Sequence, residues 1–183
     1  MLDALFKHKY ELFSDILEHS CLDFQRELVL NFSFRYYSAD HPGQENPNIF
    51  SRDRVDLPII ERAFEDARYI HFIINGKVHM MDHAGMYDYG IIQKGSYFGD
   101  VSVILQKPNE FSYLYDPNYG EAKPLYLFRI PAKTFMSLLD RYPLEKENWI
   151  ERAKKRQDFF QSYKALTLLK TMKSVVKNPA VIR

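Results

Sequence analysis

Hydrophobic and polar residues follow a helical period at both ends of the chain and a strand period in its middle. Apolar residues recur at three- and four-residue steps from Leu2 to about His19, which predicts a helix that breaks near Ser14-Asp15, where a new N-cap can start. A second short helix is predicted over residues 22–28. Two-residue alternation and a high aromatic content then predict a strand over residues 29–37.

Glycine spacing dominates the middle of the chain. Five of the seven glycines lie within the 24 residues from Gly76 to Gly99, and they separate apolar stretches at 69–75, 77–82 and 87–93. This spacing predicts short antiparallel strands joined by tight turns, as in a jelly roll or barrel. Asn75-Gly76 predicts a two-residue type I′ hairpin, in which both residues have positive φ.

The flanking segments complete the predicted order of elements. Turn formers and charges over residues 39–56, followed by a short helix opened by Pro58, predict a surface insertion at about 39–66. Two further strands are predicted over 110–115 and 124–130. Two helices follow, one opened by Pro131 and reaching residue 140, the other running from Pro143 to about Lys170.

We therefore predict an α+β fold, in which an antiparallel β-roll of the jelly-roll type is flanked by N-terminal helices and two C-terminal helices. Residues 1–30 form the N-terminal helices, 31–130 the roll, and 131–183 the closing helices and a basic tail. With 183 residues and a 46% hydrophobic content, the chain can bury a sizeable core as one compact domain.

The nearly balanced charge of the chain hides an asymmetry. Residues 1–140 carry 14 basic and 20 acidic side chains (net −6), whereas residues 141–183 carry 11 basic and 4 acidic ones (net +7). The basic segment is either a solvated helix face or a surface for membrane lipid, nucleic acid or an acidic neighbouring subunit. The run Lys154-Lys155-Arg156 is too short to predict a nucleic-acid partner.

Compartment signals point to the cytoplasm. The longest apolar runs fall far short of the roughly 18 residues that a membrane span needs, so we expect any membrane contact to depend on a segment outside this chain. The N-terminus lacks the pattern of a secretory signal. The single cysteine, Cys21, has no intrachain partner for a disulfide, which favours a reducing compartment.

Four motifs, in order, resemble the cyclic-nucleotide-binding domain family. Leu12-Phe13-Ser14-Asp15 with Glu27-Leu28-Val29-Leu30 looks like its first helices, and residues 70–78 look like its most recognisable hairpin. Residues 95–102 stand where its phosphate-binding cassette belongs. The resemblance covers roughly residues 9–160. Within the family, the chain most resembles the cytosolic C-terminal domain of voltage-gated-type cation channels. The two closing helices of that domain are matched by Phe135, Leu138, Tyr142-Pro143, Trp149, Ala153 and Arg156.

The resemblance implies a cassette at residues 95–112, where a short helix after a glycine binds the cyclic phosphate, an arginine neutralises it and a glutamate binds the ribose. Asp100 replaces that glutamate with a shorter side chain, and Asn109 falls at the arginine position. Glu110 brings a negative charge toward the phosphate, and Phe111 crowds the pocket. The cassette positions implied to contact ligand are Phe98, Gly99, Asp100, Val101, Ser102, Asn109, Glu110 and Ser112.

These departures imply a degenerate pocket that no longer binds cyclic AMP or cyclic GMP, and we expect no cofactor. Its cavity is then filled by side chains of the chain itself, such as Phe111 or Tyr113, or by a segment of the tail. In the closing helix, Trp149, Ala153, Arg156 and Phe160 share one face. That face packs on the roll, and it also fits a movable lid with Arg156 facing the ligand site.

An enzyme is not predicted. With a two-residue turn at Asn75-Gly76, His71 and His79 point to opposite faces of the sheet, while His79 and His83 lie roughly 13 Å apart, so neither pair can share a metal ion. Residues 95–100 lack the lysine and hydroxyl residue of a phosphate-loop motif. We therefore predict neither catalytic residues nor metal ligands.

Three functional hypotheses remain. The first is a non-catalytic cytosolic regulatory domain of a cation channel, at the cytosolic face of a plasma or ciliary membrane. This domain has lost nucleotide binding. It acts through contacts within the chain or between subunits of a homo-oligomer or larger assembly. The second is the same domain as a live cyclic AMP or cyclic GMP sensor. The third is a stand-alone interaction scaffold of the same fold in a cytoskeletal or ciliary assembly.

Overall fold

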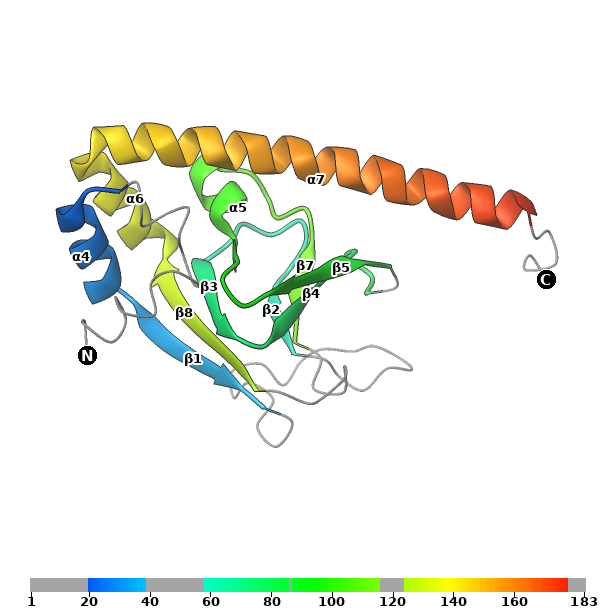
Figure 1. Cartoon of the computed structure of the whole chain (residues 1–183), viewed down its shortest axis with the longest axis horizontal. Coiled ribbons are helices and arrows are strands. Elements are labelled where there is room, and N and C mark those ends of the chain that lie inside the picture. Colours follow the sequence, from blue (N-terminus) through cyan, green and yellow to red (C-terminus); the bar gives the residue numbers. More distant parts are fainter. Residues whose placement is uncertain (1–19, 39–57, 86, 116–123, 178–183) are drawn as a thin grey trace.

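The computed structural model describes residues 20–38, 58–85, 87–115 and 124–177, and it places them in two four-stranded antiparallel sheets with helices along one side (Figure 1). The strands are β1 (Ser33–Tyr37), β2 (Ile59–Glu61), β3 (Tyr69–Asn75), β4 (Lys77–Met81), β5 (Asp88–Gln93), β6 (Tyr97–Phe98), β7 (Ser112–Leu114) and β8 (Leu125–Pro131). The helices are α4 (Leu22–Leu30), α5 (Asp100–Leu105), α6 (Ala132–Arg141) and α7 (Pro143–Lys177).

Strand order explains how the chain closes into a roll. One sheet has the order β1-β8-β3-β6 and the other the order β2-β7-β4-β5, so the consecutive strands β3 and β4 belong to different sheets. The predicted hairpin at Asn75-Gly76 is therefore wrong, because these residues form a corner between sheets. Only Gly76 has positive φ, at 91°, and a Cβ there would lie 2.9 Å from the Leu125 Cα atom.

Most of the predicted α+β fold is confirmed within the described residues. The strands at β3, β4, β5, β7 and β8, and the helices α4, α6 and α7, occur where the sequence pattern places them. Two further predictions were wrong: residues 29 and 30 belong to α4 and not to a strand, and Pro58 is followed by the strand β2 and not by a helix, within the stretch predicted as a surface insertion. The predicted helix over residues 2–19 and the insertion over 39–57 lie outside the described residues.

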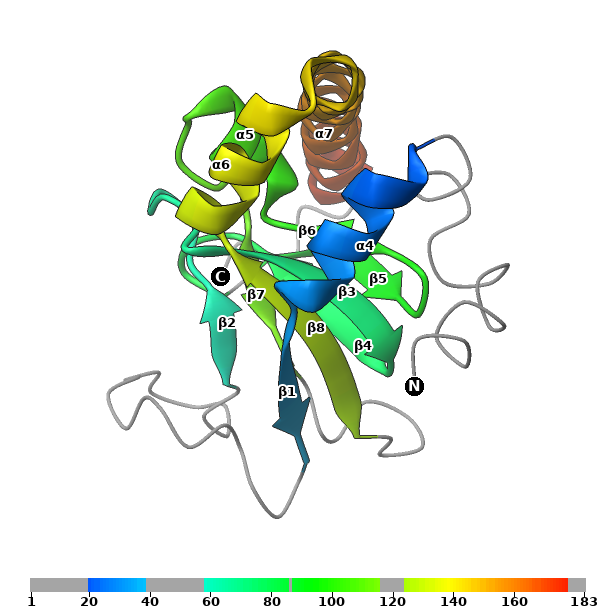
Figure 2. The same cartoon turned by 90° about the vertical axis from the view of Figure 1, so that its left-hand side faces the viewer.

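Two buried clusters hold these layers together. One fills the interior of the roll and contains Ile73, Val78, Phe98, Phe111, Tyr113, Leu125 and Leu127. The other lies between the outer face of the β1-β8-β3-β6 sheet and the helices, which Figure 2 shows against one end of that sheet, and it contains Phe24, Leu28, Ile70, Phe72, Ile130, Phe135, Leu138 and Trp149. Helix α7 contributes to both clusters, through Trp149 and Phe160.

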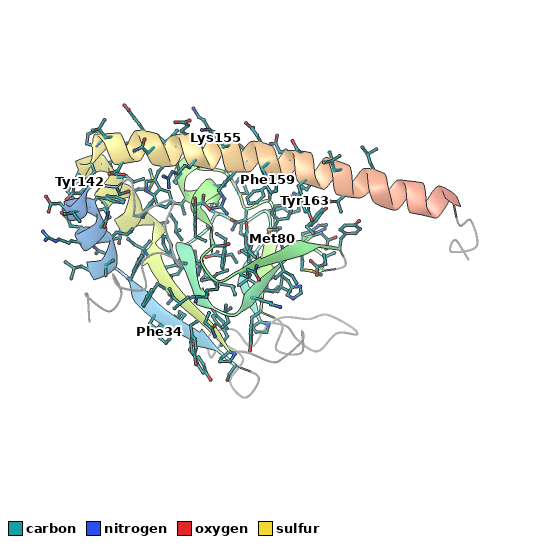
Figure 3. All side chains as sticks on the ribbon, viewed as in Figure 1. Phe34, Met80, Tyr142, Lys155, Phe159 and Tyr163 are labelled. Carbon is teal, nitrogen blue, oxygen red and sulfur yellow. The ribbon has the colours of Figure 1, made fainter. Side chains whose placement is uncertain are left out.

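Aromatic side chains continue along the outer face of this sheet beyond the part that the helices cover. Phe34 pairs with Phe128 and Tyr36 with Tyr126 across β1 and β8. The Phe34 and Tyr126 rings lie 5.8 Å apart and those of Tyr36 and Tyr126 lie 5.3 Å apart, both stacked. Phe34 is 55% exposed and stands on the outside of the sheet in Figure 3. Such cross-strand pairs stabilise the register of β1 on β8.

A buried hydrogen bond joins the two sheets. His71 on β3 and Glu61 on β2 are both buried, and the His71 Nε2 atom lies 2.9 Å from a Glu61 carboxylate oxygen. The His71 ring stacks on Phe98 at 4.7 Å. Burial lowers the pKa of His71, with Arg129 and Arg68 adding to the effect and Glu61 opposing it, so we assign a neutral ring whose Nε2–H donates to Glu61.

This pair predicts a loss of stability in mild acid. Because the pKa of His71 is lower in the folded state than in the unfolded chain, acid favours the unfolded state once the pH falls below about 6.5. We expect His71 to account for about 1 kcal/mol of the unfolding free energy lost between about pH 7.5 and about pH 5.5, and urea denaturation at both pH values measures it. The variant His71→Gln should show a smaller loss, whereas the exposed-site control His83→Gln should match the parent chain. Equal losses in all three proteins would contradict the assignment.

Candidate functional site

The cassette segment begins where strand β6 passes through Gly99 into helix α5. Gly99 has φ of 86°, and a Cβ at this position would collide with the carbonyl oxygen of Tyr69. The Val103 backbone N–H donates to the Gly99 carbonyl at 3.0 Å, which starts the helix. Glycine is thus required here for both conformation and space, and it fixes the point at which α5 begins.

Asp100, the first residue of α5, forms a buried ion pair with the closing helix. Its side chain is 1% exposed, and a carboxylate oxygen accepts a hydrogen bond from Arg156 Nη1 at 2.7 Å. Arg156 also donates through Nη2 to the Tyr97 carbonyl at 2.8 Å, and its guanidinium carbon lies 4.2 Å from the centre of the Tyr97 ring. Arg156 therefore binds three groups at the start of the cassette.

The groups around this pair keep the Arg156 guanidinium protonated. Burial raises the pKa of Asp100, and the Arg156 guanidinium opposes that rise. For Arg156, burial acts to lower the pKa, but the Asp100 carboxylate and the Tyr97 phenol outweigh it and the pKa is raised. The cation of Arg156 is thus fixed beside the Asp100 carboxyl group.

A second ion pair closes the other end of the cassette. Lys164 Nζ lies 3.2 Å from a Glu110 carboxylate oxygen and donates to the Glu110 carbonyl oxygen at 2.9 Å. The same ammonium group lies 4.6 Å from the centre of the Phe111 ring. Phe160, one turn earlier on α7, meets Phe111 edge to face at 5.2 Å. Helix α7 therefore covers both ends of the segment in which the sequence places the ligand site.

Other predicted ligand positions have structural partners. Ser102 Oγ accepts a hydrogen bond from the Ala67 backbone N–H at 2.9 Å, and Ser112 Oγ accepts one from the Ala63 backbone N–H at 3.1 Å. The side chain of Phe98 stacks on Tyr113 at 4.5 Å inside the roll, and the half-buried Val101 packs against the same cluster. These side chains hold neighbouring segments in place.

Asn109 stands out among the cassette positions. It is buried, and its backbone is held by hydrogen bonds with Glu65 and Phe64 at 2.9 and 2.8 Å. Within the described part of the chain, its side-chain amide nitrogen has no hydrogen-bond partner. The position at which the family resemblance expects an arginine thus holds a neutral donor.

The closing-helix residues separate into one that anchors the helix and others that contact the cassette. Trp149 is buried against Phe135 and Tyr97, with ring centres 4.9 and 5.6 Å away, so it anchors the first turns of α7. Arg156 and Phe160 contact the cassette. Lys164 escaped the sequence analysis, although the step of four residues from Arg156 to Phe160 continues to it and could have identified it.

A groove of about 470 Å³ runs along α7 beside the cassette. In Figure 3, Phe159 and Tyr163 of α7 lie above Met80 of β4 at this groove. Tyr89, Tyr97 and Arg156 also line it, so its walls are largely aromatic with one cation.

No group of three or more histidine, cysteine, aspartate or glutamate side chains in the described ranges could hold a metal ion. His79 Nδ1 contacts an Asp88 carboxylate oxygen at 2.9 Å, and His71 contacts Glu61. None of the described helices combines the length and the apolar character needed to cross a bilayer.

Comparison with known proteins supports the fold. No protein-family profile and no curated protein matches the sequence. A structure of the C-linker/CNBHD of zELK channels, crystallized in the presence of cAMP, superposes with a TM-score of 0.55 at 13% identity and covers 77% of this chain and 60% of that chain. The regulatory domain of Toxoplasma gondii PKA with cAMP superposes with a TM-score of 0.54 at 12% identity and covers 78% of this chain and 46% of that chain.

The order of elements, the cassette between β6 and β7, and the closing helix over it agree with this similarity. The chain spans about half of one matched structure and three fifths of the other. From its strands to its closing helix, the chain has the fold of the cyclic-nucleotide-binding domains.

Proposed function

We propose that this chain is a non-catalytic regulatory domain whose ligand site is occupied by its own closing helix. The observation that carries the proposal is the pair of contacts from α7 to the cassette, Arg156 to Asp100 at 2.7 Å and Lys164 to Glu110 at 3.2 Å. In this arrangement the closing helix takes the place of a ligand. The domain then works through contacts within the chain and with neighbouring subunits.

Charge in the cassette argues against a cyclic phosphate as ligand. A phosphate near α5 meets the carboxylates of Asp100 and Glu110 in partly desolvated surroundings, where repulsion is several times stronger than in water. Withdrawing Arg156 to neutralise the phosphate leaves Asp100 buried without its cation, which is costly. The neutral Asn109 supplies no replacement for that cation. Cyclic AMP and cyclic GMP are therefore poor ligands of the closed domain.

The wider setting is also part of the proposal. Similarity to a channel C-linker/CNBHD supports a role as the cytosolic part of a cation channel or related assembly, with other subunits as partners. Such a domain lies in the cytoplasm at a membrane face, and its membrane-spanning region belongs to a segment outside this sequence. Neither a cofactor nor a nucleic-acid partner enters this scheme.

Isothermal titration of the whole chain with cyclic AMP and cyclic GMP, up to about millimolar concentration, tests the proposal. We expect no binding heat from the parent chain. The variant Glu110→Thr frees Lys164 to bind an anion, and Asn109→Arg with Glu110→Thr adds a second cation, so we expect binding to increase in that order. The variant Lys154→Gln, on an exposed position of α7, is the control that should stay silent.

The opposite result has a clear meaning. Micromolar binding to the parent chain would replace this proposal with the live-sensor hypothesis. Intrinsic fluorescence of Trp149, the only tryptophan of the chain, verifies in the same samples that α7 remains docked in each variant.

A further inference from the structure

Helix α7 continues well beyond its contacts with the roll. It spans 35 residues, about 52 Å at 1.5 Å per residue. Lys164 makes the last of its ion pairs with the cassette, and the remaining part, residues 165–177, extends past the strands in Figure 1. We call residues 165–177 the distal segment. Leu166 and Leu169 at its start are 57% and 54% exposed.

The sequence of the distal segment is amphipathic in the helix that the structure gives it. At about 100° per residue, six apolar positions fall within an arc of about 120°. They are Ala165, Leu168, Leu169, Met172, Val175 and Val176. Leu166 and the lysines at 170, 173 and 177 fall beside this arc, and threonine and serine positions complete the circumference.

By helical spacing, the arc and the cassette-contacting residues of α7 occupy different positions around the helix axis. Arg156, Phe160 and Lys164 contact the cassette and therefore mark the inward side of the helix. The centre of the apolar arc lies about 120° around the helix axis from Phe160. On one continuous helix, the arc and the residues that contact the cassette therefore fall on different sides of the axis.

The net charge around the distal segment indicates which kind of partner its apolar arc binds. From Phe159 to Arg183 the chain has five basic residues and no acidic one, so the region carries +5. A second copy of the helix would bring equal lysines together without acidic residues to pair with them, and fewer than two heptads are present, where coiled coils need about three or more. A nucleic acid would pair with the lysines and leave the apolar arc in water.

We propose that the distal segment binds the surface of an anionic membrane, with its apolar arc in the lipid interface and its lysines at the acidic headgroups. Helices with this combination of a basic flank and an apolar face lie in the plane of the interface. Each lysine near an anionic surface strengthens binding by about fivefold. The inference depends on the distal segment alone and holds whether or not the cassette binds nucleotide.

Sedimentation of the whole chain with lipid vesicles tests it. The probes are vesicles of phosphatidylcholine alone and vesicles of equal parts phosphatidylcholine and phosphatidylserine. We expect binding to the second kind, weakening as salt rises. The triple variant Lys170→Gln, Lys173→Gln, Lys177→Gln should bind roughly a hundredfold more weakly. The matched control, Lys133→Gln, Lys154→Gln, Lys155→Gln, removes the same charge from exposed positions elsewhere and should bind like the parent.

The apolar arc has its own test. The variant Leu168→Ser, Met172→Ser should lose vesicle binding while circular dichroism and thermal unfolding of the roll stay unchanged. The proposal is overturned if both lysine variants bind alike, if phosphatidylserine makes no difference, or if the chain binds DNA and not vesicles. It is also overturned if light scattering shows a dimer that this serine variant abolishes, because the arc then belongs to a second copy.

Discussion

Replacing Arg156 by alanine is expected to lower the free energy of unfolding by about 3 kcal/mol, because it leaves a buried carboxylate without its cation. The change removes the 2.7 Å contact with Asp100, the hydrogen bond to the Tyr97 carbonyl and the stacking on the Tyr97 ring. Asp100 is 1% exposed, so water does not replace the lost partner. Urea denaturation followed by Trp149 fluorescence and far-UV circular dichroism measures the loss.

A second substitution separates the ion pair from general damage to α7. In the Arg156→Ala background, Asp100→Asn removes the uncompensated charge and should recover part of the lost stability. Lys155→Ala is the control on the same helix, since it removes an exposed pair with Glu151 and should change the unfolding free energy by less than about 1 kcal/mol. A loss in Arg156→Ala no larger than in this control, or no recovery with Asp100→Asn, contradicts the role given to the pair.

The second large effect is expected at the start of α5. Gly99→Ala should cost about 3 kcal/mol or more, because it combines a positive φ of 86° with a collision against the Tyr69 carbonyl oxygen, a backbone atom that cannot rotate away. The expected consequence is a displaced α5 and a weakened contact between Asp100 and α7. Thermal and urea unfolding measure the cost.

Gly85→Ala provides the matched control for this prediction. Gly85 also has positive φ, at 66°, but no described heavy atom lies within 4 Å of an added Cβ. Its substitution should cost only the conformational strain, about 1 kcal/mol. Similar losses of unfolding free energy at the two glycines would contradict the role given to the close approach of the Tyr69 carbonyl. The positive φ would then explain the whole effect.

Local patterns allowed much of the fold to be predicted from sequence. Glycine punctuation located β3, β4 and β5, and the prolines at 131 and 143 located the last two helices, because these signals act within a few residues. The corner at Asn75-Gly76 was misread, since a turn motif does not say whether the next strand pairs with the previous one or joins another sheet. Strand β2 was missed because three residues, one of them charged, are too few to show a period.

The candidate site was harder to predict for the same reason. The resemblance predicted a cassette at residues 95–112, and helical spacing placed Arg156 and Phe160 on one face of the closing helix. Which carboxylate meets which cation depends on the rotation and height of α7 over the cassette, across 56 residues for Arg156 and Asp100 and 54 for Lys164 and Glu110. No local pattern in the chain encodes that geometry. The loss of cyclic-nucleotide binding at these positions stays a prediction.

Helix α7 also has a mechanical consequence, because its ion pairs with the cassette are formed by Arg156 and Lys164, while the helix itself continues to Lys177. Arg156 and Lys177 are 21 residues apart on one continuous helix, which corresponds to about 31 Å. A tilt of about 10° around Arg156 therefore moves the last turn by about 5 Å. Helix α7 is thus a lever arm, which converts a small change in the contacts of Asp100 into a much larger displacement at its far end.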